Sequence, residues 1–302
     1  MHQYTMAFDV GGTFIKAAVL NKRGEIIPNS FAIFPSRSKD KAENIIDNLL
    51  TIIKQQKNMM LDKDFQILGI GYAFPGPFDY EKGVSYIKGV DKFEALYGMN
   101  VRQELMRRLK QEPSFQSKIS DGFKIVFKND AELFALGEEL IRKQEDASRT
   151  IYLTMGTGLG SAFMENRKTV SSKYNIPKNG WIYDQPYKHS IVDDYISKRG
   201  ILKIAEELGI TIKDNDVKLL AEMARNNHQK AKEVFNTFGQ NLGEVLSTYI
   251  NSFQPEAIVI GGQIAKSKDL FIDKLYEEIE DKSIVIHSVN DTSRSIFLGV
   301  AI

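Results

Sequence analysis

Two glycine-rich turns, each set between two strand-like stretches, constrain this 302-residue chain most. The first is Asp9-Val10-Gly11-Gly12-Thr13, and the second is Met155-Gly156-Thr157-Gly158-Leu159-Gly160. Glycine permits positive φ and brings backbone N–H groups close to a ligand, and consecutive N–H groups form a concave anion site. Taken singly, each turn is explained equally well as a tight hairpin. A hydroxyl at the matching position of each turn, on Thr13 and on Thr157, favours phosphate binding by the pair.

The two turns differ from the better-known glycine-rich phosphate loops. A P-loop ends in Gly-Lys-Ser/Thr before a helix, and a dinucleotide-binding fingerprint opens a helix. Both turns here lead into strands instead. A P-loop NTPase or a dehydrogenase is therefore not expected.

The composition is that of an ordinary globular protein, and its length predicts two domains. A formal net charge of +1 provides no field for nucleic acid or an anionic membrane, so neither partner is expected. No apolar run reaches the roughly 20 residues of a membrane span, and the first strand begins too early for a signal peptide. The chain has no cysteine, and its four histidines show no metal-ligand spacing. No metal ligand set is predicted, and a reducing, cytoplasmic location fits.

Apolar patterning predicts an α/β architecture in which strand–glycine turn–strand occurs twice. We expect strands over residues 4–10, 14–21, 25–34, 66–73, 124–127, 151–155, 161–165 and 256–260. We expect helices over residues 41–57, 131–143, 191–208, 217–226, 229–253 and 269–280. The polar, proline- and glycine-containing stretch 111–122 predicts a domain boundary near residue 118. It divides an N-terminal domain, 1–118, from a C-terminal domain, 119–290, with the tail 291–302 a candidate addition to the first.

Asn129 and Asp130 follow a strand and open a helix. Locally, Asn129 with Glu132 is a capping box, and Asp130 at the first helical position suits the helix dipole. Alternatively, Asp130 accepts the proton of a substrate hydroxyl as that oxygen attacks a γ-phosphoryl group. The helix N-terminus would keep the carboxylate ionised. The two interpretations are compatible.

Three further segments have both a functional and a structural interpretation. Asp9 could hold the water shell of Mg²⁺ or stabilise the turn, and Lys16 could approach a phosphate or lie exposed on its strand. The backbone of Gly261-Gly262-Gln263 could lie against adenine and ribose, or form a close helix–strand packing turn. The rigid turn Phe74-Pro75-Gly76-Pro77 could be a ligand loop or a structural corner.

Together these residues resemble the ROK family of sugar kinases, repressors and uncharacterised proteins, a branch of the actin-like ATPase and hexokinase superfamily. The matches occur in family order along nearly the whole chain. They are residues 9–13 and 154–160 for the two phosphate motifs, 74–77 for the sugar site, 129–131 for the catalytic motif, 258–262 for the adenosine motif and 297–301 for the closing segment.

The resemblance implies two actin-like, ribonuclease H-like α/β domains with an inter-domain cleft, and a sugar kinase that uses ATP and Mg²⁺. The acceptor would be a hexose-type hydroxyl, such as the 6-hydroxyl of glucose, of an amino sugar such as N-acetylmannosamine, or of a β-glucoside. Asp130 would be the catalytic base. The implied sugar-binding residues are Gly76, Pro77, Gly89, Asn129, Asp130 and Asp193. The implied nucleotide-binding residues are Asp9, Gly11, Gly12, Thr13, Lys16, Gly156, Thr157, Gly158, Gly261, Gly262 and Gln263.

The chain departs from the family pattern after the second phosphate motif. Zinc-bearing members have a Gly-Glu-x-Gly-His segment there, followed by a cysteine cluster, and the Glu and His also contact the sugar. Residues 179–183 occupy that position and the cysteines are absent, so zinc is not expected. Asp193 falls where many members have a sugar-binding glutamate.

Two other functions stay open beside the kinase. The altered segment favours a non-catalytic sugar or nucleotide sensor of the same fold. A transcriptional repressor is less favoured, because only residues 1–5 precede the first strand and the charge is near neutral. The identity of the sugar, the pathway and the oligomeric state are not predicted, and a homodimer is among the alternatives.

Overall fold

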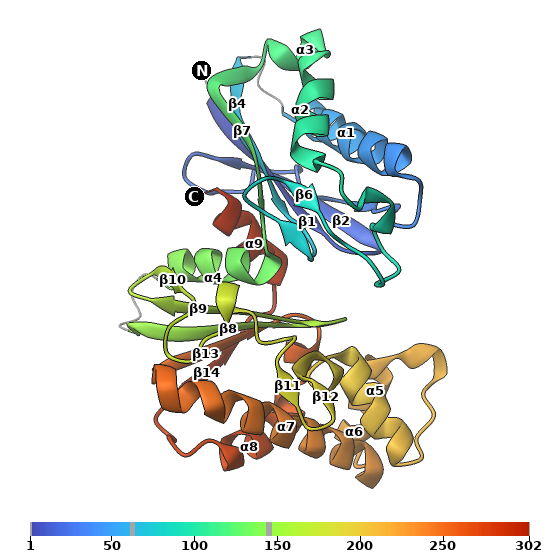
Figure 1. Cartoon of the computed structure of the whole chain (residues 1–302), viewed down its shortest axis with the longest axis vertical. Coiled ribbons are helices and arrows are strands. Elements are labelled where there is room, and N and C mark those ends of the chain that lie inside the picture. Colours follow the sequence, from blue (N-terminus) through green and yellow to red (C-terminus); the bar gives the residue numbers. More distant parts are fainter. Residues whose placement is uncertain (1, 61–63, 143–146, 302) are drawn as a thin grey trace. The chain divides into compact units, whose positions relative to one another are not determined.

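A computed structural model describes residues 2–60, 64–142 and 147–301. The chain forms two compact units (Figure 1). Unit 1 comprises Met1–Ile141 and Ser293–Ile302, and unit 2 comprises Arg142–Thr292.

The units divide after Ile141 rather than near residue 118, where we expected the boundary. The polar stretch that suggested a linker forms the short helix α3 (Pro113–Gln116) and the start of strand β7 (Ile119–Lys128). Because β7 hydrogen-bonds to a strand of the first sheet, it belongs to unit 1.

Unit 1 contains a five-stranded sheet with the order β3-β2-β1-β4-β7. Strand β1 (His2–Val10) pairs antiparallel with β2 (Phe14–Asn21), which pairs antiparallel with β3 (Ala32–Pro35). On its other side β1 pairs parallel with β4 (Phe65–Ala73), and β4 pairs parallel with β7. The first glycine turn is therefore the hairpin between β1 and β2.

The third strand is shorter than we expected, because the prediction began it at residue 25. Pro28 has no N–H to donate to a ladder, and Asn29 takes a φ of 64°. The Ser30 hydroxyl donates to the carbonyl oxygen of Ile27 at 2.7 Å, which closes a local turn. Pairing with β2 along β3 is therefore confined to Ala32–Pro35.

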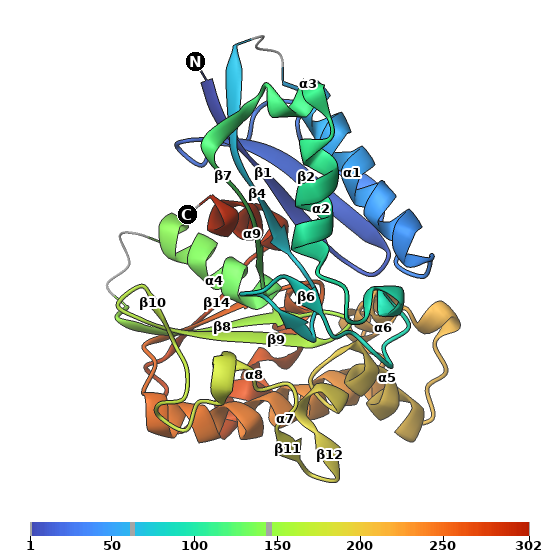
Figure 2. The ribbon, with the colours of Figure 1, turned by 45° about the horizontal axis from the view of Figure 1, so that its top comes forward.

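Helices cover both faces of this sheet. Helices α1 (Ala42–Asn58) and α2 (Val101–Lys110) lie side by side over one face, where their apolar side chains join one core (Figures 1 and 2). On the other face, Phe297 of α9 (Thr292–Val300) packs against Ala7 and Ala18.

Helix α4 (Asp130–Ile141) packs closely against α9 within unit 1. A Cβ on Gly137 would lie 1.8 Å from the carbonyl oxygen of Ser295, and one on Gly299 would lie 2.1 Å from that of Leu133. The two helices can approach this closely only because both positions are glycine. We expected α4 to run to residue 143, which lies outside the described residues.

Unit 2 repeats the topology of unit 1. Its sheet has the order β10-β9-β8-β13-β14, with two antiparallel pairings followed by two parallel ones. The predicted internal duplication is therefore present in the fold. The strands are β8 (Arg149–Met155), β9 (Leu159–Glu165), β10 (Lys168–Val170), β13 (Ala257–Gly261) and β14 (Val285–Ser288).

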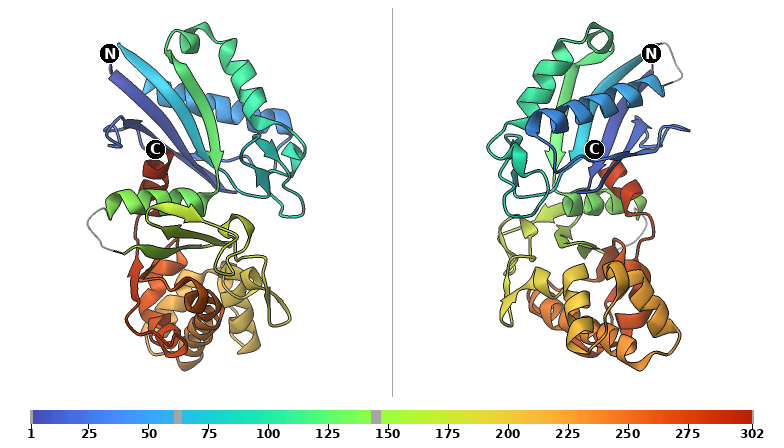
Figure 3. Two further views of the ribbon diagram at one scale, coloured as in Figure 1. Left: turned by 60° about the vertical axis from the view of Figure 1, so that its left-hand side comes forward. Right: turned by 90° about the vertical axis from the view of Figure 1, so that its right-hand side faces the viewer.

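The helices of unit 2 gather on one face of this sheet (Figure 3). They are α5 (Lys198–Glu207), α6 (Val217–Arg225), α7 (Gln229–Phe253) and α8 (Lys268–Glu278). We expected a helix from residue 191, but Ser197 has an extended backbone (φ −157°, ψ 179°), so α5 begins only after it. Of the helices in the described ranges, none combines the length and apolar character that a membrane crossing needs.

Several short elements complete the two units. The short strands are β5 (Phe78–Asp79), β6 (Val84–Ser85), β11 (Pro186–Tyr187) and β12 (Ser190–Ile191). The 3₁₀ turns are η1 (Glu94–Leu96), η2 (Lys178–Gly180), η3 (Val192–Asp194), η4 (Lys213–Asn215) and η5 (Ile264–Ser267).

Candidate functional site

The parallel strands of unit 1 end level with one another at one edge of the sheet. Asp9 of β1 is paired in register with Ala73 of β4, and Ala73 with Lys128 of β7. The segments that follow these strands are the first glycine turn, the Phe74–Pro77 turn and the pair Asn129-Asp130. Three segments far apart in the sequence therefore meet at the edge where ligands bind in open α/β sheets.

The first glycine turn is anchored through a carbonyl oxygen, whereas two of its N–H groups make no hydrogen bond within the described residues. The carbonyl oxygen of Gly12 accepts hydrogen bonds from the hydroxyls of Ser36 and Ser38, both at 2.5 Å. The N–H groups of Gly12 and Thr13 make no hydrogen bond within the described part of the chain. Consecutive free N–H groups are what an anion-binding turn presents, and the side chain of Thr13 is exposed beside them.

Asp9 and Lys16 face each other across the β1–β2 hairpin. The Lys16 Nζ lies 3.8 Å from Asp9 Oδ2. The hydroxyl of Ser293, at the start of α9, accepts from Lys16 Nζ at 2.7 Å and donates to Asp9 Oδ2 at 2.9 Å. Ser293 is only 6% exposed, so this hydroxyl links the two charged groups from a buried position.

Asn129 caps α4, as its local sequence predicted. Its Oδ1 accepts from the N–H of Ala131 at 3.0 Å and from that of Glu132 at 3.4 Å. The Glu132 side chain, which a capping box would turn back to Asn129, pairs with Lys128 instead. The amide nitrogen of Asn129 makes no hydrogen bond within the described residues, so its two N–H donors remain free for a ligand.

The environment of Asp130 differs from our expectation of a readily ionised carboxylate. Burial raises the pKa of Asp130, and the negative charge of Asp9 raises it further. The N–H of Ala131 and the charge of Lys92 act in the opposite direction but do not outweigh these two effects. The helix N-terminus thus provides too little stabilisation to keep the pKa at its ordinary value.

Lys92 is a candidate site residue that no sequence pattern singled out. It lies in the loop between β6 and η1, and a Cβ on Gly12 would meet its Cδ at 3.0 Å. Its charge also acts on Asp130. Ser293 was missed in the same way, because contacts between distant parts of the chain place both side chains.

The remaining predicted sugar-side residues of unit 1 lie on adjoining loops. The peptide bond between Gly76 and Pro77 is cis, and the carbonyl oxygen of Pro77 accepts from the N–H of Tyr86 at 3.0 Å. Gly89 follows in the same loop as Lys92, with a φ of 74°, and a Cβ added there would meet no heavy atom within 4 Å. Gly76 is half-buried, whereas Pro77 and Gly89 are exposed, so a ligand can reach the backbone of both loops.

Unit 2 gathers the second set of predicted residues at the matching edge of its own sheet. Gly261 of β13 is paired with Thr154 of β8, so the second glycine turn and Gly262 follow neighbouring strands. Gly262 has a φ of 93°, and a Cβ there would lie 2.2 Å from the carbonyl oxygen of Met155. Gly262 thus packs against the end of strand β8, and not in the helix–strand turn that was the structural alternative. This contact places its backbone directly against the start of the second turn.

The second turn also presents unused N–H groups. The N–H of Gly156 donates to the carbonyl oxygen of Gly158 at 3.0 Å, whereas those of Thr157 and Gly158 make no hydrogen bond within the described residues. Thr157 and Gly158 are exposed, as is Gln263 beyond Gly262. Each unit therefore holds one open glycine turn with a hydroxyl beside it.

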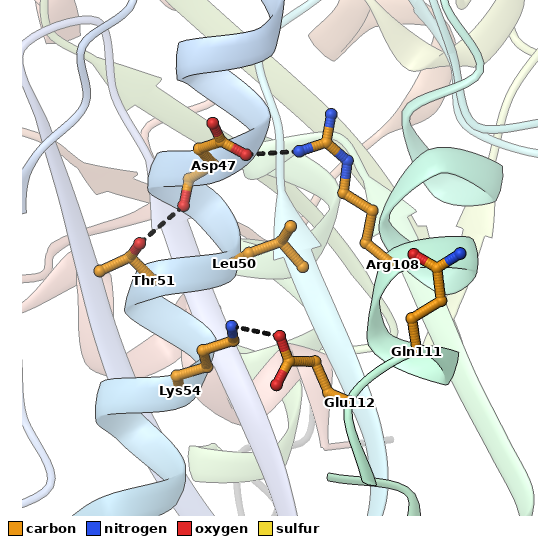
Figure 4. A pocket seen from close by; sticks show the side chains of 7 residues that line it. All are labelled: Asp47, Leu50, Thr51, Lys54, Arg108, Gln111 and Glu112. Atoms are coloured by element: carbon orange, nitrogen blue, oxygen red, sulfur yellow. Dashed lines mark hydrogen bonds and ion pairs between the residues drawn. The ribbon is translucent and has the colours of Figure 1, made fainter. Parts of the chain in front are cut away.

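One groove of about 290 Å³ lies elsewhere, between α1 and α2 of unit 1 (Figure 4). Asp47 forms an ion pair with Arg108 across the groove, and Lys54 forms one with Glu112. These ion pairs join α1 to α2 and to the residues that follow α2. No residue predicted to bind substrate or nucleotide lines this groove.

The family model that matches this chain describes the ROK family and covers residues 5–293. The chain belongs to the ROK family. Its relatives include a glucokinase of Halalkalibacterium halodurans, 24% identical over 92% of this chain and 86% of the relative. An N-acetyl-D-glucosamine kinase of Vibrio parahaemolyticus is 26% identical over 90% and 86%, and the xylose repressor of Bacillus subtilis is 20% identical over 92% and 69%. The ROK relatives therefore include both kinases and repressors.

Solved structures of glucokinases share the fold. A glucokinase from Parabacteroides distasonis superimposes with a TM-score of 0.76 at 20% identity, over 99% of this chain and 96% of that one. A ROK family glucokinase from Streptomyces griseus, in complex with glucose and AMPPNP, gives 0.73 at 18% identity, over 99% and 98%. The expected actin-like α/β fold is confirmed by these likenesses.

The segment that carries zinc ligands in other ROK proteins does not fit a zinc ion here. No cysteine is present, and the described residues contain no group of three or more His, Asp or Glu side chains that could hold a metal. The hairpin of β11 and β12 occupies this part of unit 2. Hydrogen bonds tie it to α7, because the Tyr187 hydroxyl bonds to Asn241 Oδ1 at 3.1 Å and to Glu244, and Lys188 Nζ bonds to the same Asn241 oxygen.

We expect the Tyr187 contacts, rather than a metal, to hold this hairpin. Tyr187→Phe should lower the thermal unfolding midpoint by about 2–4 °C, because a hydrogen bond contributes about 1 kcal/mol. A chelator such as EDTA should leave the midpoint of the wild type unchanged. The matched control is Tyr183→Phe, whose hydroxyl makes no hydrogen bond within the described residues. A midpoint that falls on chelation would show that a metal holds the fold after all.

The raised pKa of Asp130 predicts that its charge destabilises the folded protein. The folded state binds more protons than the unfolded chain between the unfolded pKa, about 3.9, and the higher folded value, so stability falls as pH rises through that window. Asp130→Asn keeps the Oδ1 acceptor and removes the charge. The variant should therefore unfold at a higher temperature than the wild type at pH 7, and the difference should vanish below about pH 3.9.

The control for this measurement is Asp121→Asn, which removes a charge from the exposed start of β7. It should not raise the unfolding midpoint. An Asp130→Asn variant that is less stable than the wild type at pH 7 would contradict the account of this carboxylate.

Proposed function

We propose that this ROK protein is an ATP-dependent sugar kinase that transfers the γ-phosphoryl group of ATP to a hexose-type hydroxyl. The observation that carries the proposal is the position of Asp130. It lies at the N-terminus of α4, on the same sheet edge as the open first glycine turn. The negative charge of Asp9 contributes to its raised pKa. A carboxylate beside an anion-binding turn is what phosphoryl transfer to a hydroxyl requires.

Asp130 is assigned as the general base. As the sugar oxygen forms a bond to the γ-phosphorus, the bond from that phosphorus to the β–γ bridging oxygen breaks and ADP leaves. The hydroxyl proton passes to Asp130. Burial favours this transfer, because a carboxylate with a raised pKa is a stronger base. Asn129 caps the helix through Oδ1 and offers its amide N–H groups to sugar hydroxyls, so the structural and functional interpretations of this residue hold together.

The nucleotide is assigned to the two open turns and the groups beside them. The free N–H groups and the hydroxyls of Thr13 and Thr157 would bind phosphate oxygens, together with Lys16. The backbone from Gly261 to Gln263 would lie against the adenosine. Mg²⁺, when bound, neutralises phosphate charge, and its preference for oxygen ligands and retained waters fits the carboxylate of Asp9.

The acceptor sugar is proposed to be a glucose-like or N-acetylated hexose. The named activities of two relatives, glucokinase and N-acetyl-D-glucosamine kinase, support this class. Asn129, Gly76, Pro77 and Gly89 are the unit 1 groups proposed to contact it. The Glu and His that other family members add are absent from residues 179–183, so no sugar ligand is proposed in that segment.

A sensor without catalysis is the second candidate, and one observation favours it. The altered segment 179–183 is tied to strand β9, since Ser161 Oγ donates to the carbonyl oxygen of Gly180 at 2.7 Å and accepts from Ile182 at 3.0 Å. These contacts give the backbone of the segment a structural role.

A coupled assay of ADP release tests the kinase. The acceptors are D-glucose, N-acetyl-D-glucosamine, N-acetylmannosamine and a β-glucoside, each with MgATP. We expect turnover with at least one acceptor, and a drop in kcat of about 10²–10⁴-fold in Asp130→Asn, because a general base contributes that much. Glu132→Gln, which changes the carboxylate two residues further along α4, is the control and should keep wild-type kcat.

The outcomes separate the two candidates. Equal kcat in the wild type and in Asp130→Asn would show that Asp130 is not the general base. Nucleotide and sugar binding without turnover of any acceptor would favour the sensor.

A further inference from the structure

The carboxylate of Asp193, which family resemblance assigns to a sugar hydroxyl, is already committed within unit 2. Its Oδ1 accepts from the N–H of Leu159 at 2.6 Å, and its Oδ2 forms an ion pair with Arg199. Its own N–H donates to the carbonyl oxygen of Tyr183 at 2.9 Å. The residue is 9% exposed, so little of it is available to a ligand.

Leu159 is the residue that ends the second glycine turn. A Cβ on Gly158 would lie 3.1 Å from Asp193 Oδ1, so the carboxylate packs directly against the turn. At the other end of the turn, the carbonyl oxygen of Gly156 accepts from the N–H of Lys198 at 2.9 Å. The segment from Asp193 to Lys198 thus holds the turn at both ends and leaves the N–H groups of Thr157 and Gly158 unused.

Charge explains why Arg199 is part of this arrangement. A carboxylate packed against a phosphate-binding turn would repel the phosphates unless its charge were neutralised. The guanidinium of Arg199 bonds to Asp193 and lies 3.5 Å from Asp194 Oδ1. Its side chain is 58% exposed, so the ion pair adds little stability by itself, and its effect is on the local potential.

We propose that Asp193, neutralised by Arg199, is a positioning residue for the second glycine turn and not a sugar ligand. It fixes the direction of the N–H groups that receive the nucleotide phosphates, so that binding does not have to order them. Aspartate has a shorter side chain than the glutamate that many family members have at this position. Its Oδ1 accepts a buried hydrogen bond from the Leu159 N–H, which suits the positioning role. The inference rests on the proposed nucleotide site and names one of its supporting residues.

Calorimetric titration with AMPPNP in the presence of Mg²⁺, and separately with D-glucose and N-acetyl-D-glucosamine, tests the proposal. Asp193→Ala should weaken AMPPNP binding roughly 10- to 100-fold, as expected for the loss of a hydrogen bond to a charged group, and change sugar affinity less than about threefold. Asp193→Asn keeps the Oδ1 acceptor and should restore AMPPNP affinity to within about threefold of the wild type.

The matched control is Asp194→Asn, which removes the same charge from the next residue without touching the turn. It should leave AMPPNP binding unchanged. Amide hydrogen exchange of Leu159, measured without any ligand, should speed up in Asp193→Ala and not in Asp194→Asn.

The alternative outcomes are distinct. Sugar affinity lost with AMPPNP affinity retained in Asp193→Ala would overturn the positioning role and restore the sugar ligand. Unchanged exchange at Leu159 would overturn it as well, whatever binds. A wild type that fails to bind AMPPNP while the Leu159 exchange follows the prediction would overturn the proposed nucleotide site and leave the support of the turn by Asp193 in place.

Discussion

Parallel hydrogen bonding of β1 with β4 and of β4 with β7 is the constraint on which the unit 1 site depends. Because the three strands run in one direction and end level, the segments after them must emerge at one edge. Asp9, the Phe74–Pro77 turn and Asp130 come together for that reason, although the chain separates them widely. The same pairing in unit 2 brings Gly262 against the second glycine turn.

The charges at this edge are balanced by groups that belong to no motif. Two carboxylates, Asp9 and Asp130, raise the free energy of each other's ionised form. Lys16 and the Ser293 hydroxyl stabilise Asp9, and Lys92 acts on Asp130. Unit 2 shows the same arrangement on a smaller scale, where Arg199 neutralises the carboxylate that supports the second turn. In both units a negative charge lies close to an expected phosphate position and has a cation beside it.

Local patterns predicted the elements that depend on local physics. The expected bounds of β2 and α7 are those observed, since an apolar run between two turns over residues 14–21 and a long apolar stripe over 229–253 are strong signals. The duplicated strand–turn–strand plan was also predicted, and the actin-like fold was predicted from six segments that match the family in order.

What the sequence could not show depends on contacts between distant residues. The stretch 111–122 has the composition of a linker, yet it leads into β7, whose pairing with β4 is a tertiary interaction. Nothing near Lys92, Ser293 or Arg199 marks these residues, because each acts through a partner far along the chain or across a turn. Asp193 was assigned from its position in a motif, and only its contacts with Leu159 and Arg199 revealed the other role.

Hydrogen exchange of the whole chain, with and without AMPPNP and Mg²⁺, tests most directly whether both glycine turns bind nucleotide. The account predicts slower exchange in peptides covering residues 9–16 and 155–160, where free N–H groups would gain phosphate acceptors, and unchanged exchange along α1 and α2. Nucleotide binding that leaves both turns unprotected, or that protects only the groove between α1 and α2, would contradict it.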